Sequence, residues 1–124
     1  MASRPLANLP VDAARIAADI EALADITEPG RPWTRRAFSP LFLEGRAYIE
    51  RRMQDAGLET RIDHAGNLIG RRAGKKGGGT LILGSHSDTV PEGGRFDGIA
   101  GLIAALEVAR SLSDKGIELD HDLE

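Results

Sequence analysis

Apolar residues along the first half of the chain follow two helical patterns and then an alternating one. Over residues 11–28 they recur at spacings of three and four, and Asp12 can cap the first turn, so we expect a helix that ends before Pro29. Ser39 and Pro40 are the residue types of a helix cap and a first turn. This second helix is expected to end near Gly57, and the alternation over residues 58–69 predicts a β-hairpin.

The second half of the chain is organised around one apolar run at residues 81–83. The run is typical of a buried strand, which ends at Gly84 and is followed by His86 and Asp88. A glycine-rich loop leads to Asp97, and apolar residues at helical spacing then predict a helix over residues 99–112. The last eight residues alternate again and predict the start of another strand. Together these elements indicate an α/β fold.

The composition is that of an ordinary globular protein, with 41% hydrophobic and 28% charged residues. The 124 residues form one domain or a piece of one, with residues 1–10 as a loose lead-in. A net charge of -3 and only five aromatic residues argue against a nucleic-acid partner. There is no membrane-length apolar run and no signal-peptide pattern, so no membrane partner is expected and the default compartment is the cytoplasm.

His86, Asp88 and Asp97 are the candidate site residues. The chain has no cysteine, so any metal must be held by imidazole and carboxylate groups, which suit Zn, Mn, Co or Ni. Pro91 and the glycines at 93 and 94 let the loop double back, so that His86 and Asp97 can meet above the end of the strand. Asp88 lies two residues beyond His86, on the same side of an extended chain, and can accept a hydrogen bond from the far imidazole nitrogen.

A plainer interpretation stays open on these residues alone. Asp97 precedes a glycine at a helix start, where an aspartate is most often an N-cap, and a His-x-Asp sequence is common by chance. A helix N-terminus also carries a partial positive charge, which disfavours a nearby cation. A metal at this place needs more carboxylates than the chain obviously supplies.

The sequence of residues 84–98, GSHSDTVPEGGRFDG, resembles the first metal-binding motif of the dinuclear metal amidohydrolases. This superfamily includes aminoacylase, glutamate carboxypeptidases and succinyl-diaminopimelate desuccinylase. The chain is most similar to the branch of N-carbamoyl-L-amino-acid hydrolases and allantoate amidohydrolases, and the similarity extends to TRRAFS at residues 34–39 and DHAGNL at residues 63–68. The resemblance implies a three-layer, phosphorylase/hydrolase-like fold, a mixed sheet flanked by helices, with residues 1–124 as the N-terminal part of the catalytic domain.

The resemblance also implies a role for each site residue. His86 binds one of two divalent metal ions (Zn, Mn, Co or Ni), Asp97 bridges the two, and Asp88 orients His86. The family's general base and another ligand come from a Glu-Glu pair on the next strand, which Glu118 and Glu124 do not match. By the same resemblance, the complete enzyme is expected to be a homodimer that hydrolyses small N-carbamoyl-L-amino acids or allantoate-like ureido acids. Because the Glu-Glu pair is absent, this chain alone is expected to be inactive.

Two other functions are compatible with the sequence. An aminoacylase or exopeptidase of the same superfamily uses the same first motif, because the residues that contact substrate lie in later parts of the family's chain. A non-catalytic α/β module with a degenerate metal site is an alternative from a different class. The residues that follow Glu124 would discriminate, since a Glu-Glu pair there supports an enzyme.

Overall fold

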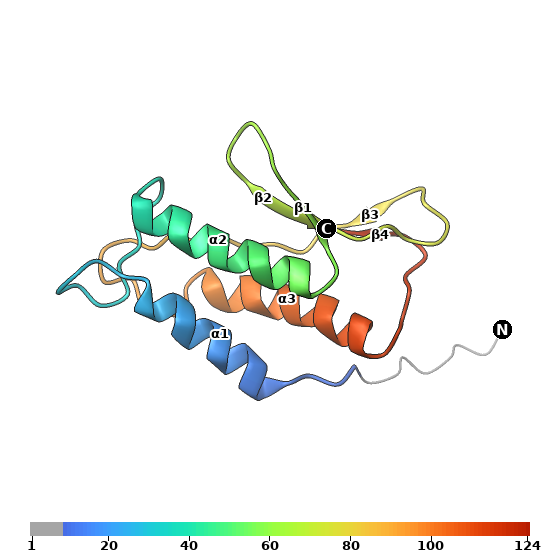
Figure 1. The fold of residues 1–124 in the computed structure, drawn as a ribbon, viewed down its shortest axis with the longest axis horizontal. Helices are drawn as coiled ribbons and strands as arrows, with labels where there is room; N and C mark the ends of the chain where they lie inside the picture. The colour runs from blue at the N-terminus through green and yellow to red at the C-terminus, as the bar shows by residue number, and fades with distance from the viewer. Residues whose placement is uncertain (1–8) are drawn as a thin grey trace.

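The computed structural model describes residues 9–124, so most of the lead-in expected over residues 1–10 lies outside the described part of the chain. Three helices lie alongside one another, α1 (Ala13–Asp25), α2 (Pro40–Asp55) and α3 (Ile99–Asp114). Four short strands accompany them: β1 (Glu59–Ile62), β2 (Leu68–Arg71), β3 (Thr80–Leu81) and β4 (Asp122–Leu123). Figure 1 shows α3 running between α1 and α2, with the strands gathered near the carboxyl ends of α2 and α3.

The two expected helix starts are confirmed by their caps. The Asp12 carboxylate accepts a hydrogen bond of 3.0 Å from the backbone N–H of Arg15 and so satisfies a donor that has no partner within α1. The Ser39 hydroxyl does the same for Phe42 at 3.2 Å, with Pro40 in the first turn of α2. None of the helices in the described residues is both long enough and apolar enough to cross a membrane.

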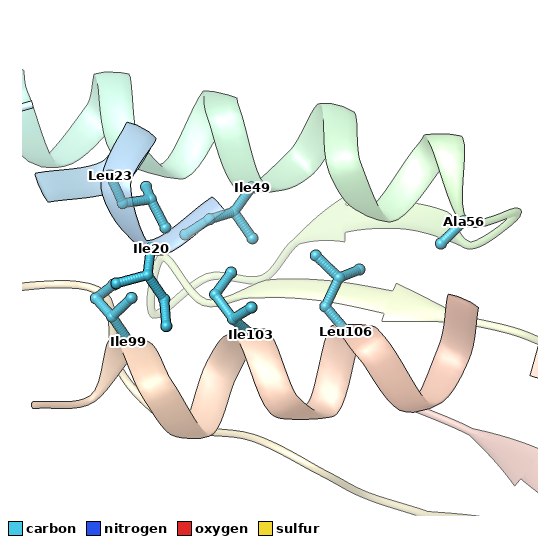
Figure 2. Close-up of a cluster of buried hydrophobic side chains, with 7 residues drawn as sticks. All are labelled: Ile20, Leu23, Ile49, Ala56, Ile99, Ile103 and Leu106. Atoms are coloured by element: carbon cyan, nitrogen blue, oxygen red, sulfur yellow. The ribbon is translucent and has the colours of Figure 1, made fainter. Parts of the chain in front are cut away.

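The main core lies where the three helices meet. Each helix contributes buried apolar side chains to one cluster, which Figure 2 shows between the facing helices: Ile20, Leu23, Ile49, Ala56, Ile99, Ile103 and Leu106. These residues recur at spacings of three, four or seven along each helix, so that one stripe of each helix faces inward. The first buried residue of α3, Ile99, comes two positions after Asp97. The packing of α3 in the core therefore also places the end of the loop that carries Asp97.

The strands form two small sheets that β4 brings together. β1 and β2 are the predicted antiparallel hairpin, with Glu59 opposite Arg71 and Ile62 opposite Leu68. β3 pairs in parallel with β4, and of the strand expected at residues 117–124 only Asp122–Leu123 are paired. An isolated antiparallel bridge between Arg72 and Leu123 joins the end of the hairpin to β4. The described residues thus contain both antiparallel and parallel pairing, in two small sheets, and the single mixed sheet stays a prediction.

The expectation of a buried strand at residues 81–83 is wrong for this chain. Regular pairing covers only Thr80 and Leu81, and the side chains of Leu81 and Ile82 are 51% and 70% exposed. A strand is buried on both faces only where elements cover both faces. Within residues 9–124 no element covers these two side chains, so the three-layer arrangement stays a prediction. The α/β class itself holds, because helices and paired strands are both present.

Candidate metal centre

The candidate site lies on the loop that connects β3 to α3. After β3 the chain passes through His86 and Asp88 without regular structure and turns back at the glycines before Phe96. Asp97 ends the loop, directly before the first residues of α3. The loop therefore reverses as the sequence predicted, and it brings together the three residues that were singled out.

The His86 ring lies between the two aspartates. Its Nδ1 atom is 3.0 Å from the carbonyl oxygen of Asp88 and 3.3 Å from an Asp88 carboxylate oxygen. Its Nε2 atom is 3.6 Å from a carboxylate oxygen of Asp97. In the tautomer with hydrogen on Nδ1, the ring donates to Asp88 and leaves the lone pair of Nε2 on the side where Asp97 lies. The imidazole, half exposed, is thus oriented by one aspartate toward the other.

Asp97 is not an N-cap. The cap position of α3 is Gly98, with φ 70°, and no side chain caps this helix. Asp97 instead accepts through its backbone carbonyl from Ile99 N–H at 2.8 Å, and its side chain is 70% exposed. The plainer interpretation of Asp97 is therefore wrong, and its carboxylate oxygens are not occupied by the helix.

Gly98 is required by the approach of His86. A Cβ atom at this position would lie 2.5 Å from both the Cε1 atom and the carbonyl oxygen of His86, closer than nonbonded atoms come. The positive φ of 70° also favours glycine over any residue with a side chain. Gly98 thus lets the backbone of the helix start pass directly beneath the imidazole.

The donor atoms fit half of a metal site. An imidazole nitrogen and a carboxylate oxygen 3.6 Å apart are compatible with two ligands of one ion at ~2.0–2.2 Å each. Across residues 9–124, however, no three His, Cys, Asp or Glu side chains are grouped closely enough to hold an ion. His64 is exposed in the hairpin turn, and His121 lies next to Gly77.

The connection between α1 and α2 packs against the loop that carries His86 and Asp88. Local sequence patterns did not predict this contact. Thr34 and Arg35, in the connection between α1 and α2, are buried against Thr89. The N–H of Arg35 donates to the Thr89 hydroxyl at 2.8 Å, and the Thr89 N–H donates to the Arg35 carbonyl at 2.8 Å. The Thr34 hydroxyl accepts from the N–H of Glu92 at 2.8 Å. The only sign of this contact in the sequence was the family similarity of TRRAFS at residues 34–39, and that similarity assigned no role to these residues.

A cavity of about 560 Å³ opens beside the candidate site. His86 and Asp88 are among its lining residues, together with the polar Arg46, Asn67 and Glu124 and apolar side chains of α2, α3 and the hairpin, such as Met53, Leu68, Leu102 and Leu106. The polar groups of the site therefore border a space large enough for a small organic molecule or a segment of chain.

Comparison with known proteins gives this arrangement a family context. No family model matches the sequence. An N-carbamoyl-L-amino-acid amidohydrolase from a Pseudomonas species is 34% identical over 89% of this chain and 27% of its own length. A ureidoglycolate hydrolase from Oryza sativa is 35% identical over 92% of the chain and 24% of its length. Allantoate amidohydrolases are also among the relatives.

A solved structure agrees with these relatives. The hydantoinase/carbamoylase family amidase from Burkholderia ambifaria matches 93% of this chain and 29% of its own with a TM-score of 0.85, and the two sequences are 40% identical. This chain is homologous to part of the hydantoinase/carbamoylase amidases. It spans about a quarter of the length of the curated relatives that it matches.

The homology confirms the expected resemblance to the N-carbamoyl-L-amino-acid and allantoate amidohydrolases, which are named as enzymes. It also confirms the small mixed α/β architecture, which the amidase from Burkholderia ambifaria shares. The roles of His86, Asp88 and Asp97 as metal ligands and orienting residue are not tested by these similarities, nor is the number or kind of metal ions. They stay predictions from the sequence.

Proposed function

We propose that this chain forms part of the metal centre of an enzyme that hydrolyses a carbamoyl or ureido C–N bond in a small acid. The observation that carries the proposal is the His86 ring held between Asp88 and Asp97, with one ring nitrogen facing each aspartate. The homology supports the reaction class. Because the chain spans about a quarter of its relatives, the activity is proposed for the complete enzyme.

The work of Asp88 in this proposal is to orient and polarise His86. A hydrogen bond from Nδ1–H to Asp88 fixes the tautomer and the ring plane, and it makes Nε2 a stronger electron donor. Asp88 is partly exposed and its carboxylate also lies 3.3 Å from Nδ1, so both its carbonyl and its side chain can accept from the ring. His86 is then ready to bind a cation through Nε2 without first having to rotate.

Asp97 supplies the second donor group. Its exposed carboxylate faces Nε2 and has two oxygen atoms, so it can bridge two cations. His86 and Asp97 would hold part of a site for divalent ions, which, if bound, would supply a lowered pKa of bound water, toward ~7, and polarisation of the substrate carbonyl. Zn, Mn, Co and Ni all suit imidazole and carboxylate donors. Asp97 would also offset part of the positive field at the start of α3, which otherwise opposes cation binding.

The substrate class rests on what the relatives' names share. N-carbamoyl amino acids, ureidoglycolate and allantoate all carry a ureido group next to a carboxylic acid, and the relatives are named for acting on them. No side chain described at the site selects a ureido group over a peptide, because His86 and Asp97 would serve either carbonyl. We infer a preference for N-carbamoyl-L-amino acids or allantoate-like ureido acids.

The test is a comparison of kcat/KM on the full-length enzyme loaded in turn with Mn, Co, Ni and Zn. We expect N-carbamoyl-L-amino acids, allantoate or ureidoglycolate to exceed dipeptides and N-acetyl amino acids, since this ratio measures differential binding of the transition state. A clear preference for dipeptides or N-acetyl amino acids would move the assignment to an exopeptidase or aminoacylase.

A second arm examines the metal ligands themselves. His86→Ala is expected to lower the bound metal and the turnover together, and Asp97→Asn is expected to do the same. His64→Ala is the matched control, because His64 is an exposed histidine in the hairpin turn. Unchanged metal content in the His86 variant would refute the proposed role.

A further inference from the structure

Arg35 is a buried arginine whose guanidinium donates hydrogen bonds to backbone carbonyls. It is 3% exposed, and its guanidinium donates to the carbonyl oxygens of Leu23 at 2.5 Å, Ile26 at 3.0 Å and Ser87 at 2.9 Å. Two of these carbonyls lie at the end of α1, where the Leu23 carbonyl also accepts from the N–H of the cap residue Ile26 at 3.2 Å. The third lies beside Asp88. One side chain thus ties the end of α1 to the loop of the candidate metal centre.

The main chain of Arg35 holds the other side of Asp88. Its N–H and carbonyl form two hydrogen bonds of 2.8 Å with Thr89, one through the hydroxyl and one through the backbone. Ser87 and Thr89, the residues directly before and after Asp88, are therefore both fixed by Arg35. The charge of Asp88 also acts on the guanidinium: burial lowers the pKa of Arg35, and the Asp88 carboxylate opposes this shift.

The second helix leaves space for this side chain. Gly45 is buried inside α2, where a glycine is less favourable than alanine by ~1 kcal/mol. A Cβ atom there would lie 2.9 Å from Cδ and 3.0 Å from Nε of Arg35. The unfavourable glycine is explained by the passage of the Arg35 side chain across the helix.

We propose that Arg35 is a positioning residue for the candidate metal centre, holding Ser87 and Thr89 so that Asp88 faces His86. The proposal rests on the function proposed above only for the identity of the site that is positioned. An arginine suits this place because its planar fork reaches three carbonyls in different directions. A lysine keeps the charge and cannot span the same three acceptors.

The main test uses Mn²⁺ titration of the full-length enzyme by calorimetry in the absence of substrate. Arg35→Lys is expected to weaken Mn²⁺ binding roughly 10- to 100-fold, the usual effect of removing support behind a metal ligand. Excess Mn²⁺ should restore most of kcat with little change in KM, because Arg35 does not contact substrate. Arg36→Lys is the control, since Arg36 is the exposed neighbour that pairs with Glu28. A purely structural role would lower Tm and leave Mn²⁺ affinity unchanged, which would overturn the proposal.

Gly45→Ala tests the same idea without changing any charge. The new methyl group should displace Arg35 and weaken Mn²⁺ binding, although alanine favours the helix. In an Arg35→Lys background the same substitution should have a smaller effect, because the two changes act through one side chain. Full additivity of the two losses would contradict the proposal.

A measurement on the full-length enzyme without metal separates this proposal from the proposed function. Hydrogen exchange at the Thr89 amide should become at least ~10-fold faster in Arg35→Lys and stay unchanged in Arg36→Lys. The substitution keeps the Arg35 carbonyl that accepts from Thr89 N–H, but it removes the guanidinium that holds this backbone segment to Ser87 and the end of α1, so the bond should open more often. Faster exchange together with absent ureido hydrolysis would refute the function alone. Unchanged exchange would refute the positioning role whatever the enzyme hydrolyses.

Discussion

The helix α3 is flanked by two clusters of charged residues with opposite properties. At its start, His86 faces Asp88 and Asp97, and all three side chains are at least 38% exposed. Along its length, Glu107 and Arg110 belong to a buried cluster in which every charge has a partner within the protein. The two clusters contain similar chemical groups, and their difference in burial separates an open site from a closed structural network.

The closed cluster joins all three helices. Arg110 donates to Asp19 of α1 at 2.5 Å, and Asp19 also accepts from the Tyr48 hydroxyl of α2 at 2.6 Å. Glu107 accepts from the Arg15 guanidinium at 2.8 and 2.9 Å. Among the described residues, no buried side-chain donor or acceptor lacks a partner. Nothing in this cluster is left to bind a ligand.

The open cluster has its donor atoms directed at solvent. Exposed ion pairs contribute little to stability, since water screens them and ordering the side chains is unfavourable. Selection for stability alone therefore gives no reason to hold an imidazole between two exposed carboxylates over a glycine. The comparison teaches that stability and ligand binding should respond to different substitutions on the same helix.

Breaking the closed cluster should have the largest effect. Arg110→Met removes the buried partner of Asp19, and we expect the free energy of unfolding to fall by ~3 kcal/mol. This is the lower end for a broken buried pair, because Arg52, 3.4 Å from Asp19, still offsets part of its charge. Urea unfolding measures this loss. Lys115→Met is the control at the exposed end of the same helix. A loss below ~1 kcal/mol in Arg110→Met would show that the cluster is not the structural network described here.

Closing the space beneath His86 should have a smaller effect. Gly98→Ala combines a positive φ with a clash against His86, and we expect a loss of about 1–3 kcal/mol together with weaker Mn²⁺ binding. Gly30→Ala is a matched control, because Gly30 has φ 72° and no atom within 4 Å of the added Cβ. The control measures the backbone term alone. Equal losses in the two variants would mean that the contact with His86 is unimportant.

The sequence predicted the three helices, the hairpin and the meeting of His86 with Asp97, because these depend on local features. The caps at Asp12 and Ser39 follow from residue type, and a glycine-rich loop of limited length brings the two ends of the motif together. The partners of Arg35 and the pair between Asp19 and Arg110 could not be predicted in this way. Asp19 and Arg110 are 91 positions apart, and no periodic pattern specifies which buried polar groups meet.

The exposure of the strand at residues 81–83 escaped prediction for a related reason. An apolar run shows that a strand can be buried, and whether it is buried depends on which elements cover it. Leu83 is partly buried against the smaller core cluster, whereas Leu81 and Ile82 are 51% and 70% exposed. Coverage therefore differs from one residue of this run to the next, and the apolar run alone does not specify it.

Acidification should cause a moderate loss of stability through the closed cluster, at Glu107. Burial disfavours the Glu107 carboxylate, yet hydrogen bonds from Arg15 and the Asp12 N–H hold its pKa below the ordinary value. Since the pKa is lower in the folded state, the stabilisation is present above the pKa of the unfolded chain and is lost as the pH falls below ~4. Urea unfolding between pH 6 and 3 should show a shallower dependence in Glu107→Gln than in the wild type or in Glu21→Gln, an exposed control. Parallel curves would contradict the assignment.

The smallest expected change in stability belongs to the residue with the largest expected role in binding. His86→Ala removes a half-exposed ring with no contact in either core cluster, so the free energy of unfolding should change by less than ~0.5 kcal/mol. The same substitution should strongly weaken Mn²⁺ binding, because it removes the imidazole nitrogen that faces the Asp97 carboxylate. A loss of stability similar to that of Arg110→Met would place His86 in the structural network and remove the distinction between the clusters. Unchanged stability with reduced metal binding, set against an unaffected His64→Ala, would assign the open cluster to ligand binding and the closed one to the fold.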